Sequence, residues 1–149
     1  MTIFWFRRDL RLDDNHGLFE ALSKSKAVLP IFIFDKTILD ELPKDDARVT
    51  FIHESLTKIN AELTKISKSL AVLYGEPKTI FNKKIRENKV DCVYTNHDYE
   101  PYAIKRDADI NTFFKEKGVS FETFKDQVIF ERNDVAKDDG TPYVVYTPF

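Results

Sequence analysis

The chain has 149 residues, of which 42% are hydrophobic and 32% charged, a balance typical of one folded domain with a continuous core. Lys and Arg number 23 and Asp and Glu 25, so the net charge of −2 lacks the basic excess that nucleic-acid-binding domains carry. The first residues reach a charged cluster too early for a signal peptide, and no apolar run has the length of a membrane span. We therefore expect a cytoplasmic domain that has no membrane partner and does not bind DNA by itself.

Short apolar runs alternate with amphipathic stretches from the N-terminus onward, a pattern typical of β-α-β units that build a parallel sheet. Residues 3–6 are too apolar and too few for a helix, which favours a first strand. Either Asp14 or Asn15 is placed to cap the helix that follows. Residues 27–34 predict a second strand that is apolar on both faces, as a central parallel strand is. Pro30 lacks an N–H group, so we expect a bulge or an irregular position within this strand.

The middle of the chain predicts one long helix, followed by a strand, a helix and another strand. Apolar residues recur in the long helix at steps of four, three, four and three, which form one stripe on a helical surface. These residues are Ile52, Leu56, Ile59, Leu63 and Ile66. Residues 70–74 then predict a third strand, residues 77–87 a helix that starts with a proline, and residues 90–95 a fourth strand.

The last predicted elements complete a single α/β domain over residues 1–149. A helix over about residues 102–117 ends at Gly118, which suits a left-handed cap, and residues 120–124 predict a fifth strand. The sequence of elements predicts a Rossmann-like, doubly wound five-stranded parallel sheet with the strand order 3-2-1-4-5.

Three polar segments follow predicted strands, at the edge of the sheet where doubly wound folds bind their ligands. They are residues 7–11, 35–36 and 96–100, and two of them place carboxylates close to aromatic residues. This combination suits a cleft for a planar ring system with hydrogen-bonding edges. The four glycines lie far apart, so neither a G-x-G-x-x-G loop nor a P-loop is present, and the histidines form no metal-binding pattern. The residues alone therefore predict a ligand-binding domain without catalytic machinery.

Three segments of the chain match motifs of one known family. FWFRRDLRLDDN, residues 4–15, matches the opening F-R-x-D-L-R-x-x-D-N pattern, and NHDYEPYAIKRD, residues 96–107, matches Y-E-P-Y-x-x-x-R-D. GTPYVVYTPF, residues 140–149, matches G-x-x-Y-x-V-[FY]-T-P-F. With all three motifs in order and at the expected spacing, the chain resembles the amino-terminal α/β domain of DNA photolyases and cryptochromes over its whole length.

The resemblance implies a protein that carries two chromophores. In this family, reduced FAD in a helical domain repairs pyrimidine dimers in DNA under blue light, and an antenna chromophore at the α/β domain passes its excitation to that flavin. The resemblance therefore implies the amino-terminal domain of a deoxyribodipyrimidine photolyase, without the carboxy-terminal FAD-binding helical domain that is its expected partner. Damaged DNA is contacted through that partner domain, so no residue of this chain is expected to be catalytic.

The antenna sites of the family differ in residues that can be compared with this chain. Members that bind methenyltetrahydrofolate carry an acidic residue where this chain has Ala103, preceded here by Tyr102 rather than asparagine. Members that bind 8-hydroxy-deazaflavin, FMN or a similar flavin carry a different set of residues at the antenna site, and this chain has matching residues at those positions. The matching residues are Phe32, Asp35, Arg48, Asp98, Glu100 and Tyr102. The resemblance therefore favours a flavin-type antenna, with Phe32 or Phe34 as an aromatic wall and with charged side chains at the ring edge.

Other classes of protein are also compatible with these residues. Within the family, the alternative is a cryptochrome photoreceptor without repair activity. Outside it, the alternatives are a stand-alone nucleotide- or flavin-binding α/β domain and a docking module with an empty pocket. We also predict an exposed apolar patch that involves Trp5 or the YVVYTPF segment, residues 143–149, and that favours self-association.

Two charged clusters within the motifs are expected to be mainly structural. Asp9 lies between Arg8 and Arg11 directly after a buried strand, which predicts charge pairing at a half-buried turn. Arg106 and Asp107 lie early in a helix and are expected to form ion pairs rather than to bind a ligand.

Overall fold

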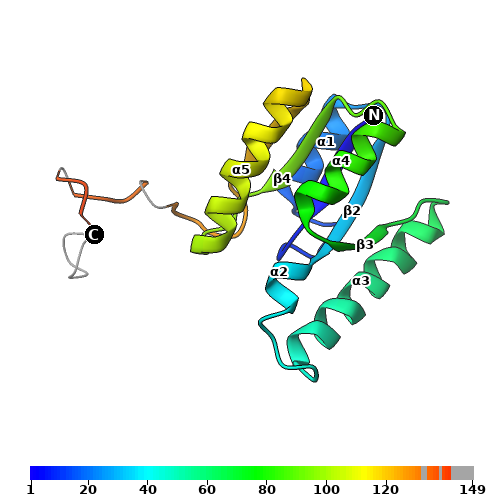
Figure 1. Ribbon diagram of the computed structural model, residues 1–149, viewed down its shortest axis with the longest axis horizontal. Coiled ribbons are helices and arrows are strands. Elements are labelled where there is room, and N and C mark those ends of the chain that lie inside the picture. The colour runs from blue at the N-terminus through cyan, green and yellow to red at the C-terminus, as the bar shows by residue number, and fades with distance from the viewer. Residues whose placement is uncertain (132–133, 138, 142–149) are drawn as a thin grey trace.

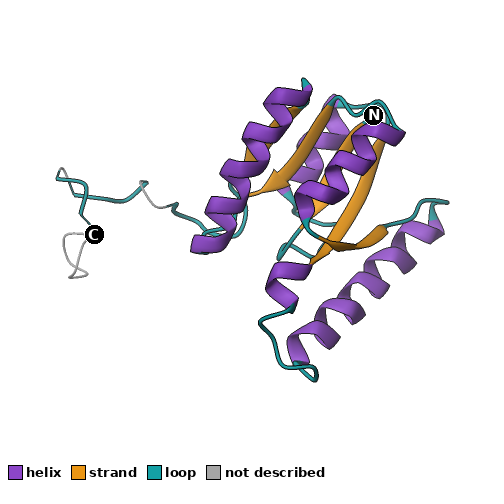
Figure 2. Cartoon of the chain, in the orientation of Figure 1, coloured by secondary structure: helices purple, strands orange, loops and turns teal. Residues whose placement is uncertain are grey.

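The computed structural model describes residues 1–131, 134–137 and 139–141, and its centre is a sheet of five parallel strands (Figure 1, Figure 2). The strands are β1 (Thr2–Phe6), β2 (Val28–Asp35), β3 (Ala71–Gly75), β4 (Cys92–Asn96) and β5 (Ser120–Phe124). Their order across the sheet is β3-β2-β1-β4-β5, and every neighbouring pair is parallel. The predicted doubly wound α/β fold and its strand order are therefore confirmed.

Five helices connect the strands in the part of the chain that the structure describes. They are α1 (His16–Lys24), α2 (Lys36–Leu39), α3 (Ala47–Lys65), α4 (Pro77–Glu87) and α5 (Pro101–Lys117). Asn15 caps α1 by accepting the N–H of Leu18, and Gly118 ends α5 with a φ of 67°. The short helix α2 was not predicted, because a single turn has no apolar periodicity. No helix among the described residues is both long and apolar enough to span a membrane.

The sheet separates two apolar cores, one on each face. In Figure 1, α4 and α5 lie in front of the sheet and α1 lies behind it. The core under α4 and α5 includes Ile3, Trp5, Ile31, Ile33, Phe81, Val93, Ile110 and Phe114. The core under α1 and α3 includes Phe4, Phe6, Leu18, Ala21, Phe32, Leu56, Ile59 and Tyr94. Successive residues of β1 and β2 alternate between these cores, which is why both strands are apolar on both faces.

Pro30 lies within β2 without the bulge that we expected. The register between β1 and β2 runs without interruption along β1, and Pro30 lies opposite Phe4. β3 pairs with β2 only from Ile31 onward, so β2 has a single neighbouring strand at the position of the proline. A strand tolerates a proline where one of its sides is unpaired, since no ladder donor is lost there.

The predicted apolar patch at Trp5 is wrong. Trp5 is only 2% exposed, because strand alternation places it under α4, where its ring packs edge-on against Phe81 at a centroid distance of 5.1 Å. The other segment of that prediction, residues 143–149, lies outside the described residues. The apolar stripe of the long helix also ends earlier than predicted, since α3 ends at Lys65 and Ile66 is 65% exposed.

A buried hydrogen-bond network joins the loop after β1 to α1 and to the end of β4. The Asp9 carboxylate accepts the backbone N–H of Arg7 at 2.8 Å and Nδ2 of Asn96 at 2.6 Å. Asn15 donates Nδ2 to the same carboxylate at 3.1 Å and accepts Nδ2 of Asn96 at 2.8 Å. A single carboxylate thereby connects three segments that are distant in the sequence.

The arginines on either side of Asp9 pair with other carboxylates, so the predicted pairing with Asp9 is wrong. Nη1 of Arg8 lies 3.0 Å from Glu100, and Nη2 of Arg11 lies 2.9 Å from Asp126. Short amide side chains fill the buried space around Asp9, whereas the longer arginine side chains extend to the partly exposed surface.

We predict that Gly17→Ala destabilises the fold by about 1–3 kcal/mol, despite the better helix propensity of alanine. A Cβ atom at Gly17 would lie 2.6 Å from Oδ1 of Asn96, and this oxygen also accepts the Gly17 N–H at 2.8 Å. Because Asn96 is held by the buried network, it has little freedom to move away. Urea denaturation should show this loss, while Ser23→Ala on the exposed face of α1 should leave stability nearly unchanged. Equal stabilities of the two variants would contradict the prediction.

Candidate functional site

A cavity of about 580 Å³ lies at the carboxyl ends of β1 and β2. Its other walls come from α2, from the first turns of α3 and α5, and from the segment after β4. We call it the carboxyl-end cavity; its volume is within the range of pockets that bind small molecules and cofactors. The structure brings all six predicted site residues together in its lining, namely Phe32, Asp35, Arg48, Asp98, Glu100 and Tyr102.

Asp35 connects three walls of the carboxyl-end cavity. Its buried carboxylate accepts the Tyr102 hydroxyl at 2.8 Å and caps α2 by accepting the Thr37 N–H at 3.0 Å. Nη1 of Arg106 lies 3.9 Å from the same carboxylate. Burial and the hydrogen bond to Asp35 raise the pKa of Tyr102, so its hydroxyl stays protonated and remains a donor. Asp35 therefore fixes the positions of α2 and α5 relative to the end of β2.

Arg48 is held at the mouth of the cavity by a neighbour on its own helix. Its Nε and Nη2 atoms donate to the two oxygens of Asp46 at 2.9 and 2.7 Å, and Asp46 also caps α3 through the Arg48 N–H. The Arg48 side chain is 70% exposed, and its hydrogen bonds lower the pKa of Asp46 to about 2. The charged Asp46 thus keeps an accessible guanidinium group in a defined place.

Two carboxylates after β4 supply acceptors at the rim of the cavity. Glu100 pairs with Arg8 at 3.0 Å, and both side chains are largely exposed. Asp98 lies two residues earlier and accepts the backbone N–H of Glu100 at 3.4 Å. An exposed ion pair is worth little to stability, so Glu100 can exchange Arg8 for a ligand group at low cost.

The remaining lining is mostly apolar. The rings of Phe32 and Phe34 pack edge to face at a centroid distance of 5.0 Å. Further apolar side chains in the lining are Phe6, Ile38, Leu42, Val49 and Ile52. A cavity with an aromatic wall and charged groups at its rim can shield a planar ring from water while it satisfies the polar edge of that ring.

Trp5, Arg7 and Arg106 also line the cavity, although none of them is among the six predicted site residues. Arg7 lies in the segment 7–11 that was predicted at this edge of the sheet, whereas Trp5 and Arg106 lie outside the three predicted polar segments. Both arginines belong to the motifs on which the family resemblance rests, so these motifs could have indicated that the two residues lie at the site. The predicted ion pairing is confirmed, since Asp107 lies 3.2 Å from Nε of Arg106 and 2.6 Å from Nη1 of Arg7. The side chain of Arg106 also borders the cavity, and the expectation that it does not bind a ligand stays a prediction.

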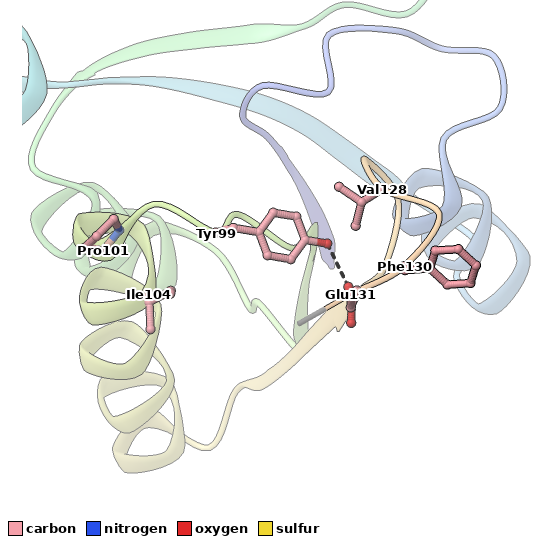
Figure 3. Close-up of a pocket in the computed structure, with 6 residues that line it drawn as sticks. All are labelled: Tyr99, Pro101, Ile104, Val128, Phe130 and Glu131. Carbon is pink, nitrogen blue, oxygen red and sulfur yellow. Dashed lines mark hydrogen bonds between the residues drawn. The ribbon is translucent and has the colours of Figure 1, made fainter. Parts of the chain in front are cut away.

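A second hollow, of about 710 Å³, lies between the start of α5 and the loop after β5 (Figure 3). It is lined by Tyr99, Pro101, Ile104, Val128, Phe130 and Glu131. Figure 3 shows the Tyr99 hydroxyl pointing at Glu131, to which it donates at 2.9 Å. Burial and this hydrogen bond raise the pKa of Tyr99 to about 12. None of the six predicted site residues lines this hollow, so the carboxyl-end cavity is the candidate site.

Two solved photolyases share the fold. An archaeal photolyase from Sulfolobus tokodaii, solved with two FAD molecules and with the implication of a novel light-harvesting cofactor, has a TM-score of 0.81 and 39% identity. That match covers 88% of this chain and 30% of the archaeal chain. A class III photolyase from Agrobacterium tumefaciens has a TM-score of 0.86 and 31% identity, over 99% of this chain and 30% of that chain.

Sequence relatives agree with the structural ones. The deoxyribodipyrimidine photo-lyase of a Synechococcus strain is 31% identical over 147 residues, which are 99% of this chain and 30% of that protein. Cryptochromes also match, at lower identity. This chain therefore spans about 30% of the length of the photolyases that it matches. The family model described as DNA photolyase matches residues 2–149, and the chain belongs to the DNA photolyase family.

Proposed function

We propose that this chain is the antenna domain of a DNA-repair photolyase and that its carboxyl-end cavity binds a flavin-type chromophore. The ligand is 8-hydroxy-deazaflavin, FMN or a related flavin rather than methenyltetrahydrofolate. The observation that carries the proposal is that the six residues of the flavin-type set, which come from three separate segments of the sequence, line one cavity. The archaeal relative with two FAD molecules adds support for a flavin as second chromophore.

The lining suits each part of such a ligand. Phe32 and Phe34 offer an aromatic surface for a tricyclic ring, and the apolar side chains around them exclude water. Asp98 or Glu100 would accept an N–H group of the ring edge, and Arg48 would donate to a carbonyl or to a side-chain oxygen of the ligand. When bound, the chromophore supplies light absorption, and its excitation passes to FAD.

The repair reaction itself would take place in a partner domain that binds FAD and contacts damaged DNA. A cryptochrome photoreceptor is the second candidate, because cryptochromes match the same residues of this chain. Illumination of the full-length protein with DNA that contains pyrimidine dimers separates the two, since only a photolyase restores the intact bases.

A fluorescence titration of the purified chain tests the proposed ligand class. FMN and 8-hydroxy-deazaflavin should quench the fluorescence of Trp5, which lines the cavity, and at least one of them should bind with a dissociation constant in the micromolar range. Methenyltetrahydrofolate should bind at least about tenfold more weakly. Tight folate binding without flavin binding would overturn the proposal.

We predict that Arg48→Ala weakens FMN binding by about tenfold, the usual effect of removing one charge-assisted hydrogen bond. Stability should change little, because the side chain is 70% exposed and its ion pair lies at the surface. The matched control is Arg86→Ala, which removes an exposed arginine from α4, outside the cavity lining. Isothermal titration calorimetry measures both variants, and an equal affinity loss in the two would mean that Arg48 does not contact the ligand.

A further inference from the structure

Trp5 is the only tryptophan of the chain, and two arginines lie over its ring at the wall of the carboxyl-end cavity. The Cζ atom of Arg7 is 4.5 Å from the centroid of the indole, and the Cζ atom of Arg106 is 4.9 Å from it. Among the described residues, Nε and Nη2 of Arg7 and Nη2 of Arg106 are buried without a hydrogen-bond partner. The two Cζ distances place both guanidinium groups in cation–π contact with the indole.

The two cations are kept in place by carboxylates, and burying them is costly. The side chains of Arg7 and Arg106 are 4% and 9% exposed, and Asp107 binds both of them. Burial lowers the pKa of Arg7, and the nearby carboxylate of Asp107 opposes this shift only in part. The guanidinium group still stays charged at neutral pH, as arginine does in proteins. Apolar side chains would pack against Trp5 without this desolvation cost. The arrangement therefore calls for a role beyond packing.

That role follows from the chemistry of an indole next to an excited flavin-type ring. In the competing reaction, Trp5 gives one electron to the photoexcited chromophore and becomes an indole radical cation. Return of that electron restores Trp5 and releases the absorbed energy as heat, so the excitation no longer reaches another flavin. A positive charge within 5 Å of the indole opposes this step, because the radical cation and the guanidinium group repel each other in a medium of low dielectric.

We infer that Arg7 and Arg106 protect the excited antenna chromophore by making Trp5 difficult to oxidise. The inference rests on the proposed flavin-type ligand and assigns these arginines a role that the ligand-contacting residues do not have. In Arg106→Gln the positive charge beside the indole is lost while Asp35 keeps its negative charge, so oxidation of Trp5 becomes easier.

The test is the fluorescence lifetime of FMN bound to the wild-type chain and to four variants. Arg106→Gln should shorten the lifetime by roughly two- to tenfold, the range expected when one unit charge beside an electron donor is removed. Trp5→Phe should leave the lifetime close to that of the wild type, and the double variant should regain it. Arg86→Gln, which removes an exposed charge from α4, should have no effect.

Two further variants cover the case in which Arg106→Gln does not fold. Arg7→Gln should shorten the lifetime in the same way, and Arg106→Lys, which keeps the charge, should retain the wild-type lifetime. Unchanged lifetimes in both glutamine variants would overturn the inference, and so would a shortening that persists without Trp5. Failure of the wild-type chain to bind FMN or 8-hydroxy-deazaflavin is a different result, which overturns the proposed function and the inference together.

Discussion

Asp9→Ala should lower the free energy of unfolding by roughly 2–4 kcal/mol, a large share of the stability of a domain of this size. Asp9 is 2% exposed and accepts hydrogen bonds from the Arg7 backbone and from the side chains of Asn15 and Asn96. An alanine leaves the Arg7 N–H buried without this acceptor and removes the shared partner of two amides. Because water cannot reach these donors, their lost hydrogen bonds are not replaced.

Urea denaturation followed by circular dichroism measures this change. Asp13→Ala is the matched control, since Asp13 lies in the same loop but is exposed. Asp9→Asn should fall between the two variants, because it keeps one acceptor oxygen but turns an N–H group toward other donors. A loss in Asp9→Ala no larger than that of the control would show that the network contributes little to folding.

Asp35→Ala should weaken FMN binding by about 100-fold, the largest binding effect that we expect from a single side chain of the site. The carboxylate holds the Tyr102 hydroxyl, caps α2 and lies 3.9 Å from Arg106. Loss of this carboxylate releases the parts of the cavity wall that α2 and α5 provide, so a ligand would have to order both helices when it binds. We also expect a loss of about 1 kcal/mol in stability, because the helix cap is removed.

Asp40→Ala is the control for this experiment, because Asp40 is the C-cap of the same short helix but does not line the cavity. It removes one negative charge and the exposed ion pair with Lys36. Asp35→Asn should bind FMN better than Asp35→Ala, since it still caps α2 and accepts from Tyr102. Wild-type affinity in a folded Asp35→Ala variant would contradict the assignment of Asp35 to the site.

The six residues of the candidate site could be anticipated only because the motifs resemble those of a known family. Without that resemblance, the residues predicted polar segments after three strands but no particular ligand set. The residues that surround Trp5 show most clearly what could not be predicted from the sequence. Arg7 and Asp107 form an ion pair across 100 positions of the sequence, and no local pattern relates two residues at that separation. Their contact depends on β1 and α5 being brought together by the sheet.

The local pattern of apolar and polar residues by itself determined the order of the strands and of the longer helices, though not the one-turn helix α2, because strand and helix periods differ and each buried face must be apolar. It also limited the cap of α1 to Asp14 or Asn15 and placed the cap of α5 at Gly118, because caps depend on neighbouring backbone groups. Only the tertiary structure decided that Trp5 lies buried beneath two arginines, that amides rather than arginines satisfy Asp9, and that the six ligand-set residues line one cavity. These outcomes depend on which segments are in contact, and those contacts are determined by the packing of elements that lie far apart in the sequence.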